Sequence, residues 1–187
     1  MKRKSRWLAL GSCLALLVFA AAVSMAADVE PKAGQSVGNF KFPAPTSDQD
    51  AKYLGLAKAA EFTIKDVKAP YILVEQFNTT CPHCMAQAPI MNQLFDKVQQ
   101  DAALKDKVKF LGLAQGNDAN AVKMWKMFQK IQFPQIADSK SAWGDAVNFH
   151  PYPVSYLVDK SGKILWVHIG TFESADEALK EIKKLAK

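Results

Sequence analysis

The sequence predicts an α/β fold in which a central β-sheet of mixed strand direction is flanked by helices. The first observation is the order of its patterns: two buried strands are each followed by an amphipathic helix, and a hairpin and a last helix end the chain. The second is size, because 187 residues with an apolar fraction of 49% suit one domain with extensions and a substantial core.

The first half of this fold rests on two apolar runs and two helical patterns. Tyr71–Phe77 is nearly all apolar, which is typical of a central buried strand. A helix is expected over Pro82–Gln100, with Pro89 inside it as a predicted kink. A second strand is predicted at Val108–Leu113 and a second helix at Asp118–Ile131.

The second half predicts a hairpin and a closing helix. Val154–Val158 and Ile164–Ile169 are apolar runs joined by Asp159–Gly162, a turn sequence that indicates two antiparallel strands. Ser174–Glu177 has the spacing of a capping box and predicts the start of the last helix. Upstream, Asp28–Gly38 is polar and contains proline and glycine, so a flexible lead-in is expected there.

The N-terminus has the three parts of a secretory signal peptide. Met1–Arg6 carries four basic residues, an apolar run follows over Trp7–Val23, and Ser24-Met25-Ala26 is a small-x-small cleavage site. Residues 1–26 are therefore interpreted as a signal peptide, and the protein is expected to be periplasmic or otherwise extracytoplasmic. An uncleaved N-terminal membrane anchor is the alternative, although the apolar run is short for a permanent span.

Removal of this segment changes the charge and the cysteine count. Twenty Lys and Arg remain against 18 Asp and Glu, so most of the positive charge belongs to the export segment and no nucleic-acid partner is indicated. Cys13 leaves with the signal peptide, and the remaining cysteines are Cys81 and Cys84. A disulfide between them closes a very short loop and therefore stabilises the fold little, so a reactive role is favoured for the pair.

Cys81-Pro82-His83-Cys84 is placed at the predicted start of a helix. The N-terminus of a helix stabilises a thiolate, which is the reactive form, so Cys81 is the candidate nucleophile and Cys84 the resolving thiol. His83 can favour the Cys81 thiolate as a nearby cation or hydrogen-bond donor. The alternative for His83 is an exposed loop residue without a chemical role.

Two further positions are candidates for the site. Glu75 is a carboxylate within an apolar strand, where burial is expected to raise its pKa and let it exchange a proton with Cys84; a solvent-facing position at a sheet edge is the alternative. Pro153 enters a predicted strand and is a candidate cis-proline, which leaves the backbone of Tyr152 available to a substrate strand. A rigid loop without function is the alternative for this pair.

Taken together, these motifs resemble the thioredoxin superfamily. Glu75 lies six residues before Cys81, which is the place of the buried acid in that family. Pro89 lies five residues after Cys84, at the place of the kinking proline, and Pro153 precedes a strand, at the place of the cis-proline. The resemblance covers residues 62–187 and implies a thioredoxin-like domain there, with residues 27–61 as an N-terminal extension.

The subfamily is indicated by two features. The stretch from Phe133 to Ile164 is similar to exported TlpA/ResA-type proteins, which implies an inserted strand and helix, whereas the Pro82-His83 dipeptide is similar to DsbA-type oxidants. The segment before Pro153 departs from the TlpA/ResA pattern, because it lacks the usual glycine and Tyr152 is bulkier than usual.

The sequence therefore predicts a protein thiol–disulfide oxidoreductase that uses Cys81, Cys84, Glu75 and His83, with Tyr152 and Pro153 in its substrate groove. The expected partners are client proteins and a membrane redox partner, the reductase direction is slightly favoured, and no cofactor is expected beyond the cysteine pair. A thioredoxin-fold copper chaperone is the alternative, since two thiolates suit Cu(I). No metal is predicted as a resident ligand, because a zinc site needs four ligands and Met85 replaces the histidine of a CxxCH haem motif.

Overall fold

The predicted α/β architecture, a mixed central sheet flanked by helices, is confirmed. The computed structural model describes residues 28–58 and 60–187, so the predicted signal peptide lies outside the described residues. The central sheet has five strands in the order β5-β4-β3-β6-β7. Its strands are β3 (Tyr71–Phe77), β4 (Val108–Gln115), β5 (Gln135–Asp138), β6 (Val154–Asp159) and β7 (Ile164–Ile169). The first three are parallel, and β6 and β7 are antiparallel to their neighbours.

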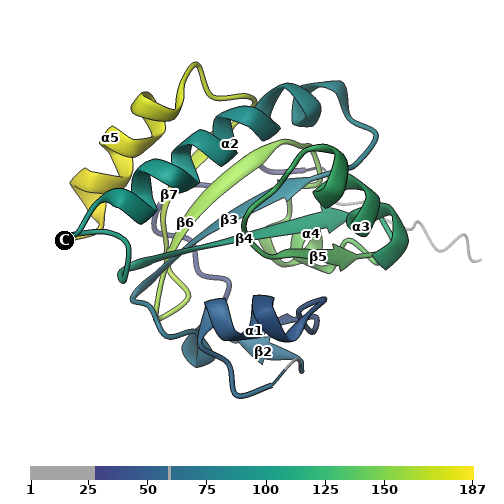
Figure 1. Cartoon of the computed structure of the whole chain (residues 1–187), viewed down its shortest axis with the longest axis horizontal. Helices are drawn as coiled ribbons and strands as arrows, with labels where there is room; N and C mark the ends of the chain where they lie inside the picture. Colours follow the sequence, from purple (N-terminus) through teal and green to yellow (C-terminus); the bar gives the residue numbers. More distant parts are fainter. Residues whose placement is uncertain (1–27, 59) are drawn as a thin grey trace, which may run out of the picture.

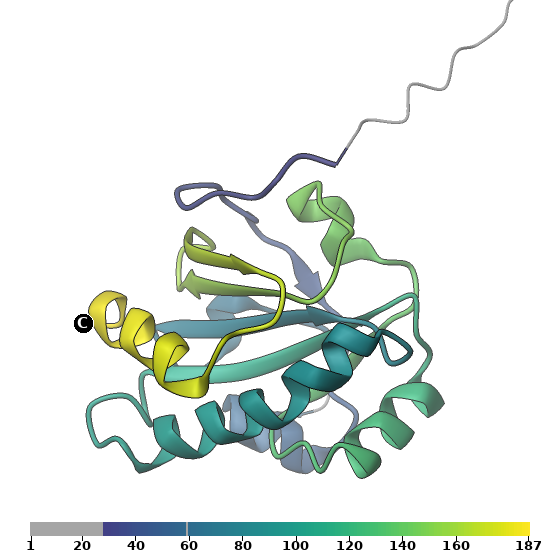
Figure 2. The same ribbon diagram turned by 90° about the horizontal axis from the view of Figure 1, so that it is seen from above.

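Helices cover the sheet on both sides and make three layers (Figures 1 and 2). One face is covered by α2 (Pro82–Gln100), α3 (Ala119–Phe128) and α5 (Ala175–Leu185), whose buried side chains join one hydrophobic cluster. The other face is covered by α4 (Ala142–Val147) and the N-terminal segment, which belong to a second cluster. Strand β5 extends the sheet beyond β4, and α4 follows it along the chain.

Alternation along β3 decides which side chains face which cluster. Leu73 and Phe77 point toward α2, whereas Ile72 and Val74 point toward α4 and the N-terminal segment. Because side chains of a strand alternate between faces, Glu75 lies on the α2 side. The β3 position between Leu73 and Phe77 on that face is therefore occupied by a carboxyl group.

Residues before β3 form a small substructure of their own. β1 (Lys41–Phe42) and β2 (Phe62–Thr63) make a two-stranded antiparallel sheet, with α1 (Asp48–Leu54) between them and the 3-10 turn η1 (Ile64–Asp66) after them. Helix α1 begins at the Ser47 cap and ends at Gly55, whose φ of 76° is a left-handed conformation that glycine adopts readily.

The expectation of a flexible lead-in at 28–38 is wrong. Gly34 N–H donates to Ile164 O, Ile164 N–H donates to Gln35 O, and Val37 N–H donates to Gly162 O. These bonds attach the segment to the start of β7 and the turn before it. The polar composition predicted flexibility, but the backbone N–H and C=O groups of this segment form hydrogen bonds with residues that are distant in sequence.

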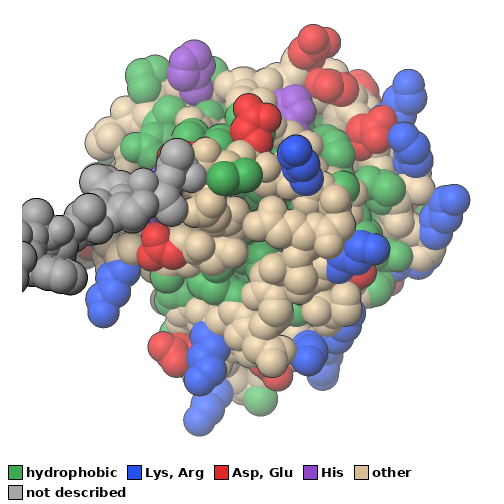
Figure 3. Space-filling model, turned by 180° about the vertical axis from the view of Figure 1, so that it is seen from behind, with side chains coloured by type: hydrophobic (Ala, Val, Ile, Leu, Met, Phe, Trp, Pro, Cys, Tyr) green, Lys and Arg blue, Asp and Glu red, His purple; other side chains and the backbone are tan. Residues whose placement is uncertain are grey.

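Two further features complete the description. Seen from behind (Figure 3), lysine and acidic side chains are interspersed on the surface, in keeping with the small net charge of the chain without its basic N-terminus. Over residues 28–58 and 60–187, none of the helices combines the length and apolar character needed to cross a bilayer.

Candidate active site

The start of α2 carries the two cysteines, as predicted. Cys81 is the N-cap residue, Pro82 occupies the first turn, and both cysteines are unpaired thiols. The Cys84 N–H donates to Cys81 Sγ at 3.4 Å, so one of the unsatisfied N–H groups of the helix end points at the sulfur. Cys81 is half-buried, whereas Cys84 is fully buried, which separates an accessible thiol from a protected one.

The turn between β3 and α2 is held by the end of β4 and the residues after it. Asn78 Nδ2 donates to Gln115 O at 2.8 Å, and Thr79 N–H donates to Asn117 Oδ1 at 2.9 Å. Asn78 Oδ1 also accepts from the N–H of Thr80 at 2.9 Å. These contacts fix the position of Cys81 relative to the sheet, as a reactive group requires.

The loop before β6 brings Tyr152 opposite Cys81. The Tyr152–Pro153 peptide bond is cis, as the sequence predicted. Cys81 Sγ lies 3.9 Å from Tyr152 O, although the two residues are 71 positions apart. Tyr152 is 40% exposed, so it lies at the surface beside the thiol.

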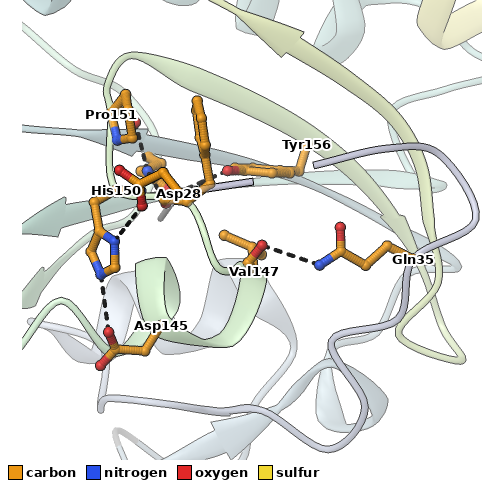
Figure 4. A network of polar contacts seen from close by, with 9 residues as sticks. Asp28, Gln35, Asp145, Val147, His150, Pro151 and Tyr156 are labelled. Atoms are coloured by element: carbon orange, nitrogen blue, oxygen red, sulfur yellow. Dashed lines mark hydrogen bonds and ion pairs between the residues drawn. The ribbon is translucent and has the colours of Figure 1, made fainter. Parts of the chain in front are cut away.

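Gln76, the residue after Glu75, anchors this loop from the opposite face of β3. Its Nε2 donates to Phe149 O at 3.0 Å and to Pro151 O at 2.7 Å. Its Oε1 accepts from the Tyr156 hydroxyl at 3.1 Å. Gln76 is fully buried, so this network holds the backbone just before Tyr152 with satisfied polar groups (Figure 4).

A second anchor for the same loop lies at the surface. His150 is placed between two carboxylates, with Nδ1 2.9 Å from Asp28 and Nε2 3.0 Å from Asp145 (Figure 4). The hydrogen bonds to Asp28 and then Asp145 raise the pKa of His150 above its ordinary value. The N-terminal segment is thereby tied to the loop that carries Tyr152.

Glu75 is buried behind the cysteines, which contradicts the sheet-edge alternative. It is 3% exposed, and its Oε1 accepts from Gln87 Nε2 at 3.2 Å. Burial raises the pKa of Glu75 from 4.5 to about 7, and the hydrogen bond from Gln87 opposes that rise. At neutral pH this carboxyl group can therefore accept or release a proton.

The Cys84 thiol is perturbed in the same direction. Burial raises its pKa well above the ordinary value, and the hydrogen bond and charge of Cys81 and the charge of Glu75 raise it further. A thiol of this kind needs a base to become a nucleophile. Glu75 is the base within electrostatic reach, so the site pairs an accessible sulfur with a protected sulfur and a proton acceptor.

The sequence interpretation missed Gln87 and Gln76. Gln87 is fully buried on the face of α2 that also carries Cys84, and its Oε1 accepts from Phe172 N–H at 3.1 Å. Its signal was present, because an amide interrupts an otherwise apolar helical stripe three residues after Cys84. Gln76 lies near the end of an apolar strand, and its partners near Phe149 are too distant in sequence to be inferred.

Within residues 28–58 and 60–187, the His83 ring makes no hydrogen bond or ion pair. The residue is exposed, and the described contact is from the Thr171 hydroxyl to the His83 backbone oxygen at 3.2 Å. Its role beside Cys81 therefore stays a prediction.

An apolar depression of about 250 Å³ lies next to the cysteine turn. It is lined by residues of the turn, of α2 and of α3: Thr79, Met85, Ala121, Met124, Trp125, Phe128 and Gln129. Trp125 is buried, whereas Phe128 is 69% exposed. In the part of the chain that the structure describes, no group of three or more His, Cys, Asp or Glu side chains is arranged to hold a metal ion.

The fold and the paired cysteines define a thioredoxin-like protein. The sequence profile of the Redoxin family matches residues 32–183, so the chain belongs to the Redoxin family. This confirms the resemblance inferred from the motifs.

Relatives and solved structures of the same kind are similar to the chain. It is 28% identical over 121 residues to the thiol-disulfide oxidoreductase ResA of Bacillus thuringiensis subsp. konkukian, covering 64% of this chain and 67% of that protein. With a ResA of Bacillus cereus it shares 27% identity over 107 residues, covering 57% of this chain and 59% of the relative. The crystal structure of a thiol:disulfide interchange protein of the thioredoxin family from Chlorobium tepidum superposes with a TM-score of 0.60 at 20% identity, covering 86% of this chain and 100% of that one. That structure supports the fold.

The raised pKa of Glu75 predicts how stability depends on pH. The folded state keeps a proton that the unfolded state loses between pH 4.5 and about 7, so the free energy of unfolding falls as pH rises through this window. The fall amounts to at most about 3 kcal/mol. Glu75→Gln should remove it, as measured by urea unfolding of reduced protein at pH 5 and pH 8.

The matched control is Glu61→Gln, which changes an exposed carboxylate and should keep the wild-type pH dependence. Equal pH dependence in wild type and Glu75→Gln would show that Glu75 titrates normally.

Proposed function

We propose that the protein catalyses thiol–disulfide exchange with client proteins through Cys81 and Cys84. The observation that carries this proposal is the pairing of two unlike thiols. Cys81 is half-buried at a helix start, and its sulfur accepts a hydrogen bond from the Cys84 N–H. Cys84 is fully buried, within electrostatic reach of Glu75. Membership of the Redoxin family and similarity to ResA support it.

The exchange runs in two balanced steps in the reductase direction. The Cys81 thiolate attacks a client disulfide, forms a mixed disulfide and releases the first client thiolate. Cys84 then gives its proton to Glu75 and attacks the Cys81 sulfur, which forms the Cys81–Cys84 disulfide and releases the second client thiolate. Two electrons pass from the protein to the client, and the reverse steps describe an oxidase.

Tyr152, Pro153 and His83 serve the client in this proposal. The loop at Tyr152 and Pro153 lies 3.9 Å from the attacking sulfur and offers backbone groups to an extended client strand. No hydrogen-bond acceptor for the Tyr152 N–H exists among the described residues, so this donor is available. His83 supplies a cation or donor at the exposed edge of the same site.

The location and the redox partner follow from the proposed export. Residues 1–26 act as the signal peptide, residues 27–61 as an extension, and residues 62–187 as the thioredoxin-like domain. We favour the reductase direction because the stretch from Phe133 to Ile164 resembles TlpA/ResA-type reductases. A reductase outside the cytoplasm needs an electron source, so a membrane redox partner would return Cys81 and Cys84 to thiols.

The order of attack predicts different behaviour for the two cysteine variants. Cys81→Ala should abolish reduction of insulin, because no accessible thiol remains to attack. Cys84→Ala should accumulate mixed disulfides with clients, visible on a non-reducing gel, because the resolving thiol is lost. The control is the double variant, which should form no adducts; adducts in Cys81→Ala but not in Cys84→Ala would reverse the assigned order.

The direction of exchange is tested by the reduction potential of the Cys81–Cys84 pair. A reductase predicts a value near that of thioredoxin, about −270 mV, as measured by equilibration with a dithiol buffer. A value near that of DsbA, about −120 mV, would contradict the reductase direction and indicate an oxidase.

A further inference from the structure

A row of residues crosses the sheet beneath the cysteine pair. Strand register places Gln135 beside Gly112, Gly112 beside Glu75, Glu75 beside Ser155, and Ser155 beside His168. Side chains paired in register point to the same face, so all five positions lie on the α2 side with Glu75 in the middle. Four of them are polar, on a face of the sheet whose other buried side chains form a hydrophobic cluster.

Ser155 is the first step from Glu75 toward the edge of the sheet. It is fully buried, and its hydroxyl has no hydrogen-bond partner among the described residues. Residues paired across two strands have Cβ atoms about 4.5–5.5 Å apart, so the Ser155 hydroxyl is flanked by Glu75 on one strand and by His168 on the other. A buried hydroxyl can both accept and donate, which a proton relay requires.

His168 lies where the row meets the surface. It belongs to β7, an edge strand, and its ring packs on Phe172 at a centroid distance of 4.3 Å. Its Nε2 is buried and has no partner in the described part of the chain. The residue as a whole is half-buried, so part of it reaches the surface.

The opposite end of the row is closed. Gln135 is fully buried, and its amide lies directly over Gly112, where any Cβ would collide with it. This end offers no route to solvent, and the amide is a poor proton carrier. The row is therefore asymmetric, with an exit at His168.

We propose that Ser155 and His168 form the proton exit that connects Glu75 with solvent. This deepens the proposed function, since it rests on Glu75 receiving the proton of Cys84. Protonated Glu75 passes a proton, through a bridging water, to the Ser155 oxygen. At the same time the Ser155 hydroxyl passes its own proton, through a second water, to His168 Nε2. His168 then releases a proton from Nδ1 to water, so one proton leaves the protein and no group is oxidised or reduced.

Other ionisable groups near the row have different positions. Cys84 on α2 lies within electrostatic reach of Glu75 and is the source of the proton. In the loop after β7 and the start of α5, Glu173 and Glu177 are exposed. On β4 and β5, the row itself contributes Gly112 and Gln135, which do not titrate.

The test isolates the resolving step. Reduced protein is mixed by stopped flow with an excess of a fluorescent client peptide disulfide between pH 5.5 and 8.5. The phase that is followed is the one in which Cys84 releases the peptide from its mixed disulfide with Cys81. Ser155→Ala and His168→Leu should each slow release by about tenfold, and the pH midpoint of release should shift. This is less than the about 10²–10⁴-fold of a direct general acid or base, because water can partly replace a relay group. Imidazole buffer should restore the rate of His168→Leu, because it supplies the missing carrier.

Ser155→Thr is the matched control, since it keeps the hydroxyl and should release at close to the wild-type rate. Alkylation of Cys81 should be unchanged in all variants, because the first attack does not use the relay. Urea unfolding shows whether each variant is folded.

Two outcomes would overturn the exit path. Wild-type release in both Ser155→Ala and His168→Leu would mean that the proton leaves Glu75 by another route. Slowing that is equal at every pH and insensitive to imidazole would mean that the two residues only shape the packing. Failure of the proposed function is distinct, because then the wild-type mixed disulfide itself would not resolve.

Discussion

The burial of Glu75 between the sheet and α2 is the interaction on which the proposed chemistry depends. A carboxyl group without a cation beside it is costly to ionise in such a place, and one hydrogen bond from Gln87 offsets only part of that cost. The result is a pKa near neutrality next to a thiol whose own pKa is raised. Proton transfer between these two groups is therefore accessible at pH 7.

Strand β3 organises both halves of the site through two neighbouring residues on opposite faces. Glu75 points toward α2 and the cysteines, and Gln76 points toward the loop that carries Tyr152. Both side chains are buried and hydrogen-bonded: Glu75 contacts α2 through Gln87, and Gln76 holds a loop that is distant in sequence. The separation of 3.9 Å between Cys81 and Tyr152 is a consequence of this shared strand.

Much of this arrangement was accessible from the sequence, and the reason is local. Cys81 and Cys84 follow an apolar strand and begin an amphipathic helix, so their place at a helix end follows from periodicity and needs no tertiary information. Glu75 was recognisable as a charge inside an apolar run, and Pro153 as a proline at a strand entrance.

The parts that could not be predicted depend on long-range contacts. The lead-in near Gly34 has a loop-like composition, and its backbone is held by bonds to Ile164 and Gly162, which are distant in sequence. Gln76 acquires its role from the backbone of Phe149 and Pro151, which lie 73 and 75 residues further along the chain. The polar row through Ser155 and His168 requires strand order and register, which local patterns do not contain.

The most direct measurement of the central claim is a ¹³C NMR titration of the Glu75 carboxyl group in the reduced wild-type protein, assigned with Glu75→Gln. The structure predicts a midpoint near 7. A midpoint near 4.5, the ordinary value for glutamate, would show that Glu75 is ionised throughout the neutral range and would contradict its role as the proton acceptor for Cys84.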